Sequence, residues 1–418
     1  MDKLKSDAVS IWNTAVRSML PSEAVRRALK DFSPCGGRII LIAIGKAAWE
    51  MASAASEELG GRIACGCAAV KYGHSRGAFS DPNIEIYEGG HPLPDENCIA
   101  AGKRILEMTD SLSPYDTVLF LVSGGGSALF EVPLPGISLK DIENLNREML
   151  ASGAGIVEIN TLRKRFSSVK GGRFALHCAP SSVCQITLSD VIGNRMDTIA
   201  SGPAVPDMTT CAEAAAIIKR YGIKLPDIMK EYLKTETPKE LSNVRTVICG
   251  SSAELCLAAK KAAESLGYNA FIISSKVECE ARELGLMAGA VSRDIEAEIS
   301  DFKKPCAVII GGETVVHIKG KGLGGRNQEA ALSAALAISG LKNIVIAAGG
   351  SDGTDGPTDA AGGIICGETC EKITSAGCDP LSMLEDNNSY EALKCADALF
   401  VTGPTGTNVN DLMLIMAD

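Results

Sequence analysis

Short apolar runs alternate along this chain with longer segments that carry apolar residues at helical spacing. The runs have strand length and are almost continuously apolar; they are residues 39–44, 64–70, 117–122, 183–188, 244–249, 270–273, 307–310 and 344–348. Helical patterns between them include 47–59, 97–111 and 255–266. This alternation is typical of strands buried in a largely parallel sheet between helices. It predicts an α/β fold, in which sites form at the carboxyl ends of strands.

The chain has 418 residues, which is too long for one ordinary core and predicts two domains. A polar stretch with Lys, Glu and Pro, residues 233–243, interrupts the alternation and is the expected boundary. Segments 38–47 and 245–253 share one design of strand, glycine, small residues and helix. The common requirements of a strand-to-helix turn explain this likeness better than an internal repeat.

The first 32 residues place apolar side chains at helical spacing among charges, which predicts an amphipathic helix and not a signal sequence. No apolar run reaches the ~18 residues that span a bilayer, so we expect a cytoplasmic protein. Acidic residues outnumber basic ones by 51 to 41, and the net charge of −10 opposes binding to nucleic acid or to anionic membranes. Any anionic ligand must therefore be held by local donors.

The 15 cysteines are scattered through apolar runs without a Cys-x-x-Cys pair. Buried, reduced thiols explain this usage better than disulfides or zinc. The four histidines stand too far apart in the sequence to supply a metal cluster.

Three glycine-rich loops follow apolar runs: residues 123–127, 319–328 and 349–356. Such loops expose backbone N–H groups to an anion, and their Lys, Arg and Asp side chains suit phosphate charge and a metal ion. The loops predict nucleotide or phosphate chemistry.

The glycines of 320–325 fit G-x-G-x-x-G, between a strand pattern at 314–318 and a helix pattern at 327–338. That context suits a dinucleotide, with Asp352 as its ribose acid. The same residues also resemble a Walker loop that has Arg326-Asn327 in place of Lys and Ser or Thr. Neither motif is matched cleanly, and a tight turn that needs glycine is the third interpretation.

Two further candidates follow strands in the first half. Lys46 stands after Gly45 at a helix start, where the helix dipole disfavours a cation unless an anion compensates. The loop Ser123-Gly124-Gly125-Gly126-Ser127 offers two hydroxyls and lets a carboxylate or phosphate approach the backbone. A sharp strand-to-helix bend explains the loop equally well.

Several aspartates stand in turns after apolar runs. Asp352, Asp355 and Asp359 belong to a glycine-rich block, and one or two such carboxylates suit Mg²⁺. Asp190 follows another strand, where an aspartate is more often a helix cap than a ligand. His91, in a proline-rich turn, is either a base or a residue that shapes the turn.

Eight strings in this order resemble the glycerate kinase family whose C-terminal half is the MOFRL domain, and they span nearly the whole chain. They are Ile44-Gly45-Lys46-Ala47-Ala48, Gly89-Gly90-His91-Pro92, Val122-Ser123-Gly124-Gly125-Gly126-Ser127-Ala128, Ser168-Val169-Lys170-Gly171-Gly172-Arg173, Leu188-Ser189-Asp190-Val191 with Ser201-Gly202-Pro203, Gly311-Gly312-Glu313-Thr314, Gly324-Gly325-Arg326-Asn327-Gln328-Glu329 and Ser351-Asp352-Gly353-Thr354-Asp355-Gly356. The sequence departs from the family at Asn194, where Asp is usual, and at Arg165, where His is usual.

The resemblance implies a Rossmann-like α/β domain with a mostly parallel sheet, expected at 1–238, and a MOFRL-like α/β domain, expected at 239–418. It places the active site in the cleft between them. The implied reaction transfers the γ-phosphoryl group of ATP to a hydroxyl of D-glycerate, with a leaning toward 2-phosphoglycerate. The family's catalytic Lys and Arg map onto Lys46 and Arg326.

We therefore expect Lys46 and Arg326 to supply positive charge to the transferring phosphoryl group and the 123–127 loop to hold D-glycerate. Residues expected to bind ATP are Asp190, Gly324, Gly325, Asn327, Ser351, Asp352 and Gly353. Asp190 or Asp352 would hold Mg²⁺ or orient the acceptor hydroxyl. The oligomeric state stays open, with a homodimer as one candidate. Competing hypotheses are an NAD(P)H-dependent hydroxypyruvate reductase and a non-catalytic protein that binds a phosphorylated metabolite.

Overall fold

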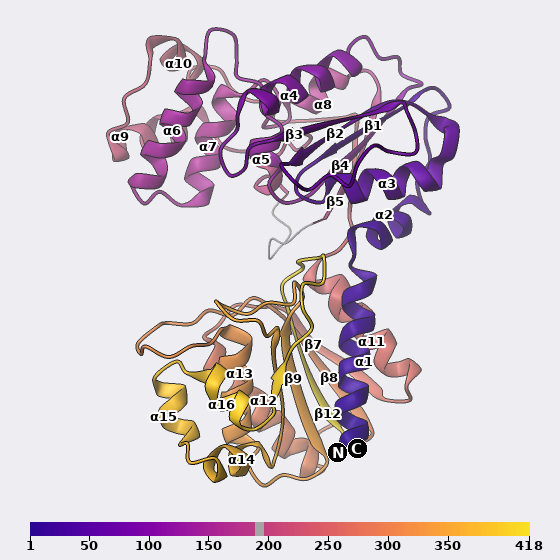
Figure 1. Ribbon diagram of the computed structural model, residues 1–418. Helices are drawn as coiled ribbons and strands as arrows, with labels where there is room; N and C mark the ends of the chain where they lie inside the picture. The colour runs from indigo at the N-terminus through magenta and orange to yellow at the C-terminus, as the bar shows by residue number, and fades with distance from the viewer. Residues whose placement is uncertain (189–195) are drawn as a thin grey trace. The chain divides into compact units, whose positions relative to one another are not determined.

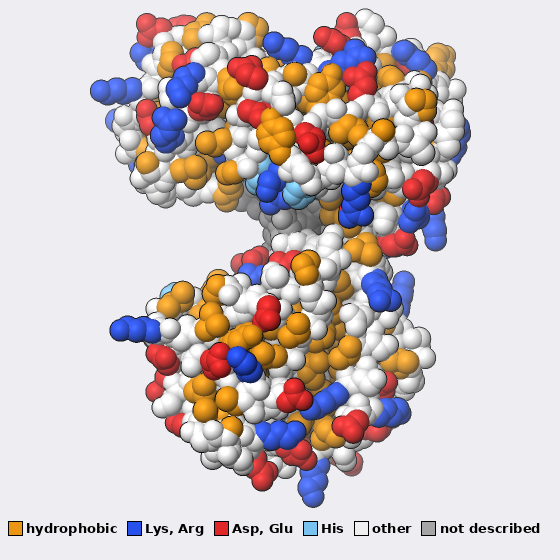
Figure 2. All heavy atoms as spheres, viewed as in Figure 1, with side chains coloured by type: hydrophobic (Ala, Val, Ile, Leu, Met, Phe, Trp, Pro, Cys, Tyr) orange, Lys and Arg blue, Asp and Glu red, His pale blue; other side chains and the backbone are white. Residues whose placement is uncertain are grey.

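The computed structural model describes residues 1–188 and 196–418. The chain divides into two compact units (Figure 1). We call Pro21–Cys249 the parallel-sheet unit, and Met1–Leu20 together with Gly250–Asp418 the mixed-sheet unit. In the view of Figure 2, acidic and basic side chains are interspersed over the described surface of each unit.

The parallel-sheet unit is built on six parallel strands in the order β3-β2-β1-β4-β5-β6. The strands are β1 (Ile39–Ile44), β2 (Ile63–Lys71), β3 (Ile84–Gly89), β4 (Thr117–Val122), β5 (Ser182–Thr187) and β6 (Val244–Ile248). The helices are α2 (Pro21–Leu29), α3 (Ala48–Leu59), α4 (Glu96–Met108), α5 (Gly126–Leu129), α6 (Leu139–Ala151), α7 (Ile156–Phe166), α8 (Arg173–Cys178), α9 (Cys211–Tyr221) and α10 (Asp227–Tyr232).

Alternate residues of the central strands face opposite sides of this sheet. Leu41 and Leu119 pack with α2 and α3, whereas Ile42 and Phe120 pack with α4 and α8. Helices α6, α7, α9 and α10 form a separate apolar core, visible beside the sheet in Figure 1. Burial on both faces explains why β1 is apolar throughout and β4 is apolar from Val118 onward.

The strand order creates a switch point between β1 and β4. The chain proceeds from β1 to β2 and β3 on one side, and from β4 to β5 and β6 on the other. The connections that leave β1 and β4 therefore diverge at the carboxyl ends of these two strands. In open α/β sheets this position is where ligands bind.

The mixed-sheet unit has the strand order β11-β10-β9-β12-β8-β7. The strands are β7 (Asn269–Val277), β8 (Cys306–Gly312), β9 (Ile344–Gly350), β10 (Gly362–Cys366), β11 (Leu399–Phe400) and β12 (Asp411–Ala417). The helices are α1 (Asp2–Ser18), α11 (Ser252–Ser265), α12 (Ala281–Glu296), α13 (Arg326–Ala337), α14 (Thr369–Ser375), α15 (Pro380–Glu385) and α16 (Ser389–Cys395). Helices α1 and α11 cover one face of the sheet, and α12 and α13 cover the other (Figure 1).

The expectation of largely parallel strands is wrong for this second sheet. Only β7 and β8 pair in parallel; β12 pairs antiparallel with both β8 and β9, and β10 with both β9 and β11. The segment 351–361 between β9 and β10 contains no helix, and without a crossover helix the two neighbouring strands pair antiparallel. The strand expected at 314–318 is also absent, since this described segment makes only a single bridge, between Val315 and Glu280.

The two units differ from the expected ranges of 1–238 and 239–418. Strand β6 pairs with β5 from Val244 onward, so the polar stretch 233–243 lies inside the parallel-sheet unit. Helix α1 belongs to the mixed-sheet unit, where the Trp12 ring meets Phe400 edge-on at 4.8 Å between centroids. The similar segments 38–47 and 245–253 differ in where their helices pack. The helix after β6, in the second segment, packs on β7 and β8 of the other sheet.

Burial of the cysteines matches the expectation from the sequence. The 15 cysteines are thiols, and all but Cys35 and Cys395 are buried or half-buried. No helix in the described part of the chain has both the length and the apolar character needed to cross a membrane.

Candidate functional site

Lys46 lies at the switch point of the parallel-sheet unit, directly after β1. Its side chain is exposed, and no ion pair among the described residues involves it. Its backbone is fixed: the N–H donates to the Gly124 carbonyl at 2.8 Å, and the carbonyl lies 3.2 Å from His74 Nδ1. The ammonium group is therefore held at the end of the sheet and remains available to an anion.

The 123–127 loop follows β4 and contacts the Lys46 turn. Ser123 Oγ accepts a hydrogen bond from the Ala47 N–H at 3.1 Å. Gly125 has a φ of +88°, and a Cβ added there would lie 3.1 Å from His91 and 3.2 Å from the Lys46 side chain. Glycine thus lets the loop approach both residues.

His91 lies beside this cation. Burial, and after it the positive charge of Lys46, lower the pKa of His91. A neutral imidazole is therefore favoured next to the lysine, so His91 adds no second positive charge at neutral pH.

A second candidate region is a cavity of about 560 Å³ within the mixed-sheet unit. Its lining includes Gly324, Gly325, Arg326 and Asp352, which brings together the two glycine-rich loops of the C-terminal half. Apolar side chains from 315–318 complete the wall. The volume falls in the range of small-molecule and cofactor sites.

Arg326 begins α13 and is oriented by two carboxylates. Its Nε and one terminal nitrogen donate to Asp411 at 2.7 and 3.0 Å, and the other terminal nitrogen donates to Glu313 at 2.8 Å. Burial lowers the pKa of Arg326, but these two carboxylates outweigh it, so the pKa is raised overall. Within the described residues these bonds use three of the five N–H donors, which leaves two for a ligand.

The 319–325 loop does not offer all its N–H groups to an anion, contrary to the expectation from its glycines. The N–H groups of Lys319 and Gly320 donate to Asn387 Oδ1 at 2.8 and 2.9 Å, and that of Gly322 donates to the Asp386 carbonyl at 2.9 Å. A Cβ on Gly320 would lie 2.2 Å from this carbonyl oxygen. Close packing on the segment before α16 therefore explains the first two glycines.

This packing also argues against the dinucleotide fingerprint. That motif requires a strand before the glycines and a backbone open to pyrophosphate. Here the segment before the glycines is not a strand. Asn387 Oδ1 also accepts hydrogen bonds from the N–H groups of Lys319 and Gly320, which a pyrophosphate would need. Asp352, the ribose acid of that interpretation, accepts a hydrogen bond at Oδ1 from the Thr354 N–H at 3.0 Å.

The three aspartates of the 349–363 block have different surroundings. Asp352 and Asp355 both line the cavity, Asp359 accepts a hydrogen bond from the Tyr390 hydroxyl at 2.8 Å, and buried Asp355 also caps α13. Asp355 accepts from the backbone N–H groups of Asn327 and Gln328 at 3.1 and 2.8 Å. Burial raises the pKa of Asp355 to about 6 despite these bonds.

Asp355 should give the stability of the mixed-sheet unit a specific pH dependence. Its folded pKa of about 6 exceeds the ordinary 3.8, so between these values the folded protein holds a proton that the unfolded chain releases. The free energy of unfolding should thus fall from pH 4 to pH 6, by up to about 3 kcal/mol, and level off above. Asp355→Asn should lack this fall, as urea unfolding at each pH would measure. A variant-to-wild-type difference that stays constant from pH 4 to 8 would contradict the assignment.

Three further residues that were expected to bind ATP, namely Ser351, Gly353 and Asn327, lie outside the cavity lining. Ser351 is buried and accepts from the Val409 N–H at 2.8 Å, Gly353 donates to the Gly350 carbonyl at 3.0 Å, and Asn327 donates to Asp355. None of the three is among the residues that line the 560 Å³ cavity in the described structure. Asp190 lies outside the described residues.

Several residues at these sites were not assigned a role from the sequence. Asp386, Asn387, Glu313 and Asp411 hold the glycine loop and Arg326, but they stand 13 to 85 residues from their partners. Asn387 has a φ of +54°, and its Nδ2 also donates to buried Glu329 at 2.8 Å. A turn-forming Asp-Asn-Asn string at 386–388 was the only local hint.

Family models match both parts of the chain. Residues 7–234 match a family described as "Domain of unknown function (DUF4147)", and residues 306–411 match the MOFRL family. The first match alone covers more than half of the chain.

Relatives matched over most of their length carry two kinds of name. A protein of Thermotoga maritima named D-glycerate 2-kinase is 49% identical, covering 99% of this chain and 98% of the relative. A glycerate 2-kinase of Pyrococcus horikoshii is 42% identical, covering 90% and 87%. A relative from Agrobacterium vitis, 38% identical over 97% of this chain and 93% of its own length, is provisionally named a hydroxypyruvate reductase.

A solved structure agrees with the sequence relatives. The crystal structure of glycerate kinase from Thermotoga maritima has a TM-score of 0.93 and 49% identity, and the match covers 100% of both chains. The Lys46 turn, the 123–127 loop and the Arg326 cluster all lie within the matched length. The chain therefore belongs to the glycerate kinase family that carries a C-terminal MOFRL domain, and it is a kinase.

Proposed function

We propose that this kinase transfers the γ-phosphoryl group of ATP to the 2-hydroxyl of D-glycerate and releases 2-phosphoglycerate and ADP. The observation that carries this proposal is full-length similarity, at 49% and 42% identity, to two proteins that are both named glycerate 2-kinases. The similarity extends over both units, so it covers every residue to which a role is given below.

Lys46 is proposed to contact the transferring phosphoryl group, with glycerate held against the 123–127 loop. An exposed ammonium group at the switch point, whose backbone is fixed by Gly124, supports this role. Phosphoryl transfer demands positioning and positive charge more than covalent chemistry, and a pre-positioned lysine supplies both.

The cavity beside Arg326 is proposed as the nucleotide site. Its 560 Å³ suits a nucleotide, and Arg326 retains donors for phosphate while Asp411 and Glu313 hold its orientation. Gly324 and Gly325 lie in the same wall. Arg326 and Lys46 would then act on one phosphoryl group, as the sequence led us to expect.

The donor set at this cavity also fits Mg²⁺. Asp352 offers a half-buried carboxylate in the wall, and Mg²⁺ needs only one or two carboxylates when waters and phosphate oxygens complete its shell. No cluster of three or more acidic, histidine or cysteine ligands occurs among residues 1–188 and 196–418. When bound, the ion would neutralise charge on the phosphate oxygens.

The proposal is tested by incubating the protein with D-glycerate, ATP and Mg²⁺ and identifying the product by ³¹P and ¹³C NMR. We expect 2-phosphoglycerate in amounts equal to the ADP formed. Formation of 3-phosphoglycerate would overturn the choice of hydroxyl and keep the reaction. NADH oxidation with hydroxypyruvate, or ligand binding without turnover, would overturn the kinase proposal in favour of the reductase or the binding protein.

A further inference from the structure

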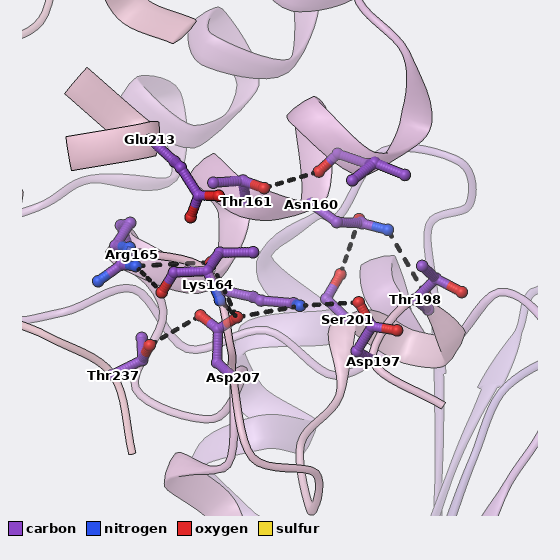
Figure 3. A network of polar contacts seen from close by, with 12 residues as sticks. Asn160, Thr161, Lys164, Arg165, Asp197, Thr198, Ser201, Asp207, Glu213 and Thr237 are labelled. Carbon is purple, nitrogen blue, oxygen red and sulfur yellow. Dashed lines mark hydrogen bonds and ion pairs between the residues drawn. The ribbon is translucent and has the colours of Figure 1, made fainter. Parts of the chain in front are cut away.

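A chain of four polar side chains leads from the interior of the parallel-sheet unit to the 123–127 loop. Ser127 Oγ lies 2.9 Å from Ser201 Oγ, and Ser201 Oγ lies 3.0 Å from Asn160 Oδ1. Asn160, on α7, is also contacted by Arg163 (3.4 Å). Figure 3 shows Asn160 between Ser201 and Thr198. The direction of each hydrogen bond in this chain can be assigned.

The assignment begins at the Asn160 amide. Its Nδ2 donates to the Thr198 carbonyl, and its Oδ1 receives the Arg163 guanidinium. The flipped amide would place Nδ2 against a guanidinium that can only donate, and Oδ1 against a carbonyl that can only accept. Both contacts would be repulsive, so Oδ1 must face Ser201.

The proton order of the two serines follows. Because Asn160 Oδ1 can only accept, the Ser201 hydroxyl donates to it. The Ser201 proton is then used, so the 2.9 Å contact with Ser127 requires Ser127 to donate to Ser201. Each hydroxyl has one proton. Ser127 is thereby left with lone pairs only, and it can accept a hydrogen bond from a ligand but cannot donate one.

The backbone around Ser201 is held in a costly conformation. Ala200 and Ser201 have φ values of +51° and +59°, although neither is glycine, and Ser201 is fully buried. Non-glycine residues in this region cost of order 1 kcal/mol each or more and persist where the surroundings over-determine them. Here the N–H of Gly171 donates to the Ser201 carbonyl at 3.1 Å. This bond helps to fix the backbone that carries the Ser201 hydroxyl.

Ser127 lies in α5, in the loop that follows β4 at the switch point, and is half-buried. A carboxylate or phosphate has no proton to donate, so it gains nothing from an acceptor, whereas an alcohol does. We propose that Ser127 is a specificity-determining residue that accepts a hydrogen bond from the 3-hydroxyl of glycerate, with Ser201 and Asn160 as positioning residues. This inference rests on the proposed function, in which the 2-hydroxyl receives the phosphoryl group.

It adds detail to one sequence-based expectation. The 123–127 loop was expected to offer two hydroxyls and to let a carboxylate or phosphate approach the backbone. Ser123 Oγ already accepts from Ala47 and donates to the Ile44 carbonyl at 3.3 Å, and Ser127 is limited to accepting. An anion at this loop would therefore depend on Lys46 and on backbone N–H groups.

The test compares the dissociation constants of three ligands by calorimetry: D-glycerate, D-lactate and (S)-3-fluoro-2-hydroxypropanoate, which has the same spatial arrangement at C2 as D-glycerate. D-lactate lacks the 3-hydroxyl, and the fluoro analogue replaces it with a group that cannot donate. Wild-type protein should bind D-glycerate about fivefold more tightly than either analogue, the worth of one neutral hydrogen bond. A fluoro analogue that binds as tightly as D-glycerate would overturn the proposal.

Ser127→Ala separates recognition from a structural role. The variant should lose the fivefold preference by binding D-glycerate more weakly, while its affinity for D-lactate stays unchanged. Equal weakening of all three ligands, or no change, would overturn the inference. Ser152→Ala is the matched control, since Ser152 Oγ donates only to the Met149 carbonyl on α6, outside the switch point.

Ser201→Ala tests the proton order itself. In this variant the Ser127 hydroxyl no longer donates its proton to Ser201 Oγ and can donate it to a ligand. The ratio of the dissociation constants for the fluoro analogue and D-glycerate should therefore decrease. An unchanged preference would contradict the assigned direction. If wild-type protein forms phosphoglycerate but none of these shifts occurs, only this inference fails; if it forms none and binds no D-glycerate, the proposed function fails with it.

Discussion

Lys46→Met is expected to lower kcat/KM for glycerate phosphorylation by ~10²-fold or more, with the fold intact. Removing one pre-positioned charge contact to a transition state typically has an effect of this size. The side chain is exposed and enters no ion pair among the described residues, so methionine removes the charge without leaving a buried partner. Steady-state kinetics and the midpoint of thermal unfolding check both halves of the prediction.

Lys103→Met on α4 is the matched control, because it removes another exposed ammonium from the same unit. This variant should keep near-normal activity. If Lys46→Met retained more than a tenth of the wild-type kcat/KM, Lys46 would not contact the transferring group.

A double-mutant cycle tests whether Lys46 and Arg326 act on one phosphoryl group. If they do, Lys46→Met and Arg326→Gln should be non-additive, and the double variant should lose less activity than the product of the two single losses. Fully multiplicative losses would indicate independent roles. Arg326→Gln must be checked for stability, because it leaves Asp411, 8% exposed, without its guanidinium partner.

Lys170→Met is expected to destabilise the parallel-sheet unit by about 3–5 kcal/mol. Lys170 is fully buried and its Nζ donates to Glu131 at 2.6 Å and to the Phe130 carbonyl at 2.9 Å. Burial lowers the pKa of Lys170, with the Glu131 charge acting in the opposite direction. Methionine fills a similar volume but leaves the Glu131 carboxylate buried without a counter-charge. Urea unfolding measures the loss.

A second substitution, at Glu131, tests whether the unpaired carboxylate causes the loss of stability. Glu131→Gln added to Lys170→Met should restore part of the stability, since it removes the orphaned charge. The control is Lys260→Met in the exposed Lys260–Glu264 pair, where the atoms are 3.8 Å apart and less than about 1 kcal/mol is expected. A loss below 1 kcal/mol for Lys170→Met would show that the buried pair contributes little.

Helix α7 also carries buried charged side chains that form ion pairs. Lys164 meets Asp207 at 3.3 Å and Asp197 at 3.5 Å, and Thr237 donates to Asp207 at 2.7 Å (Figure 3). Arg165, where the family usually has His, donates to Glu236 at 2.9 Å and to nearby carbonyls. The departure at Arg165 thus lies within a structural network, and its position gave no hint of these partners.

The sequence determined the local elements of this protein and the residue types of its chemistry. Almost continuous apolar runs identified β1, β4 and β8, because strands buried on both faces leave little room for polar positions. Glycine and charge after β1 and β4 identified the Lys46 and 123–127 turns. Motifs in series indicated the glycerate kinase family, which the comparisons confirm.

Only the tertiary structure decided how distant segments share one environment. It placed α1 on the C-terminal sheet, inserted β12 between β8 and β9, and set Asn387 and Asp386 against the glycine loop. It also brought Ser127, Ser201 and Asn160 within hydrogen-bond distance of one another. Such contacts join residues that are far apart in sequence, and their hydrogen-bond geometry depends on packing that local pattern and propensity do not encode.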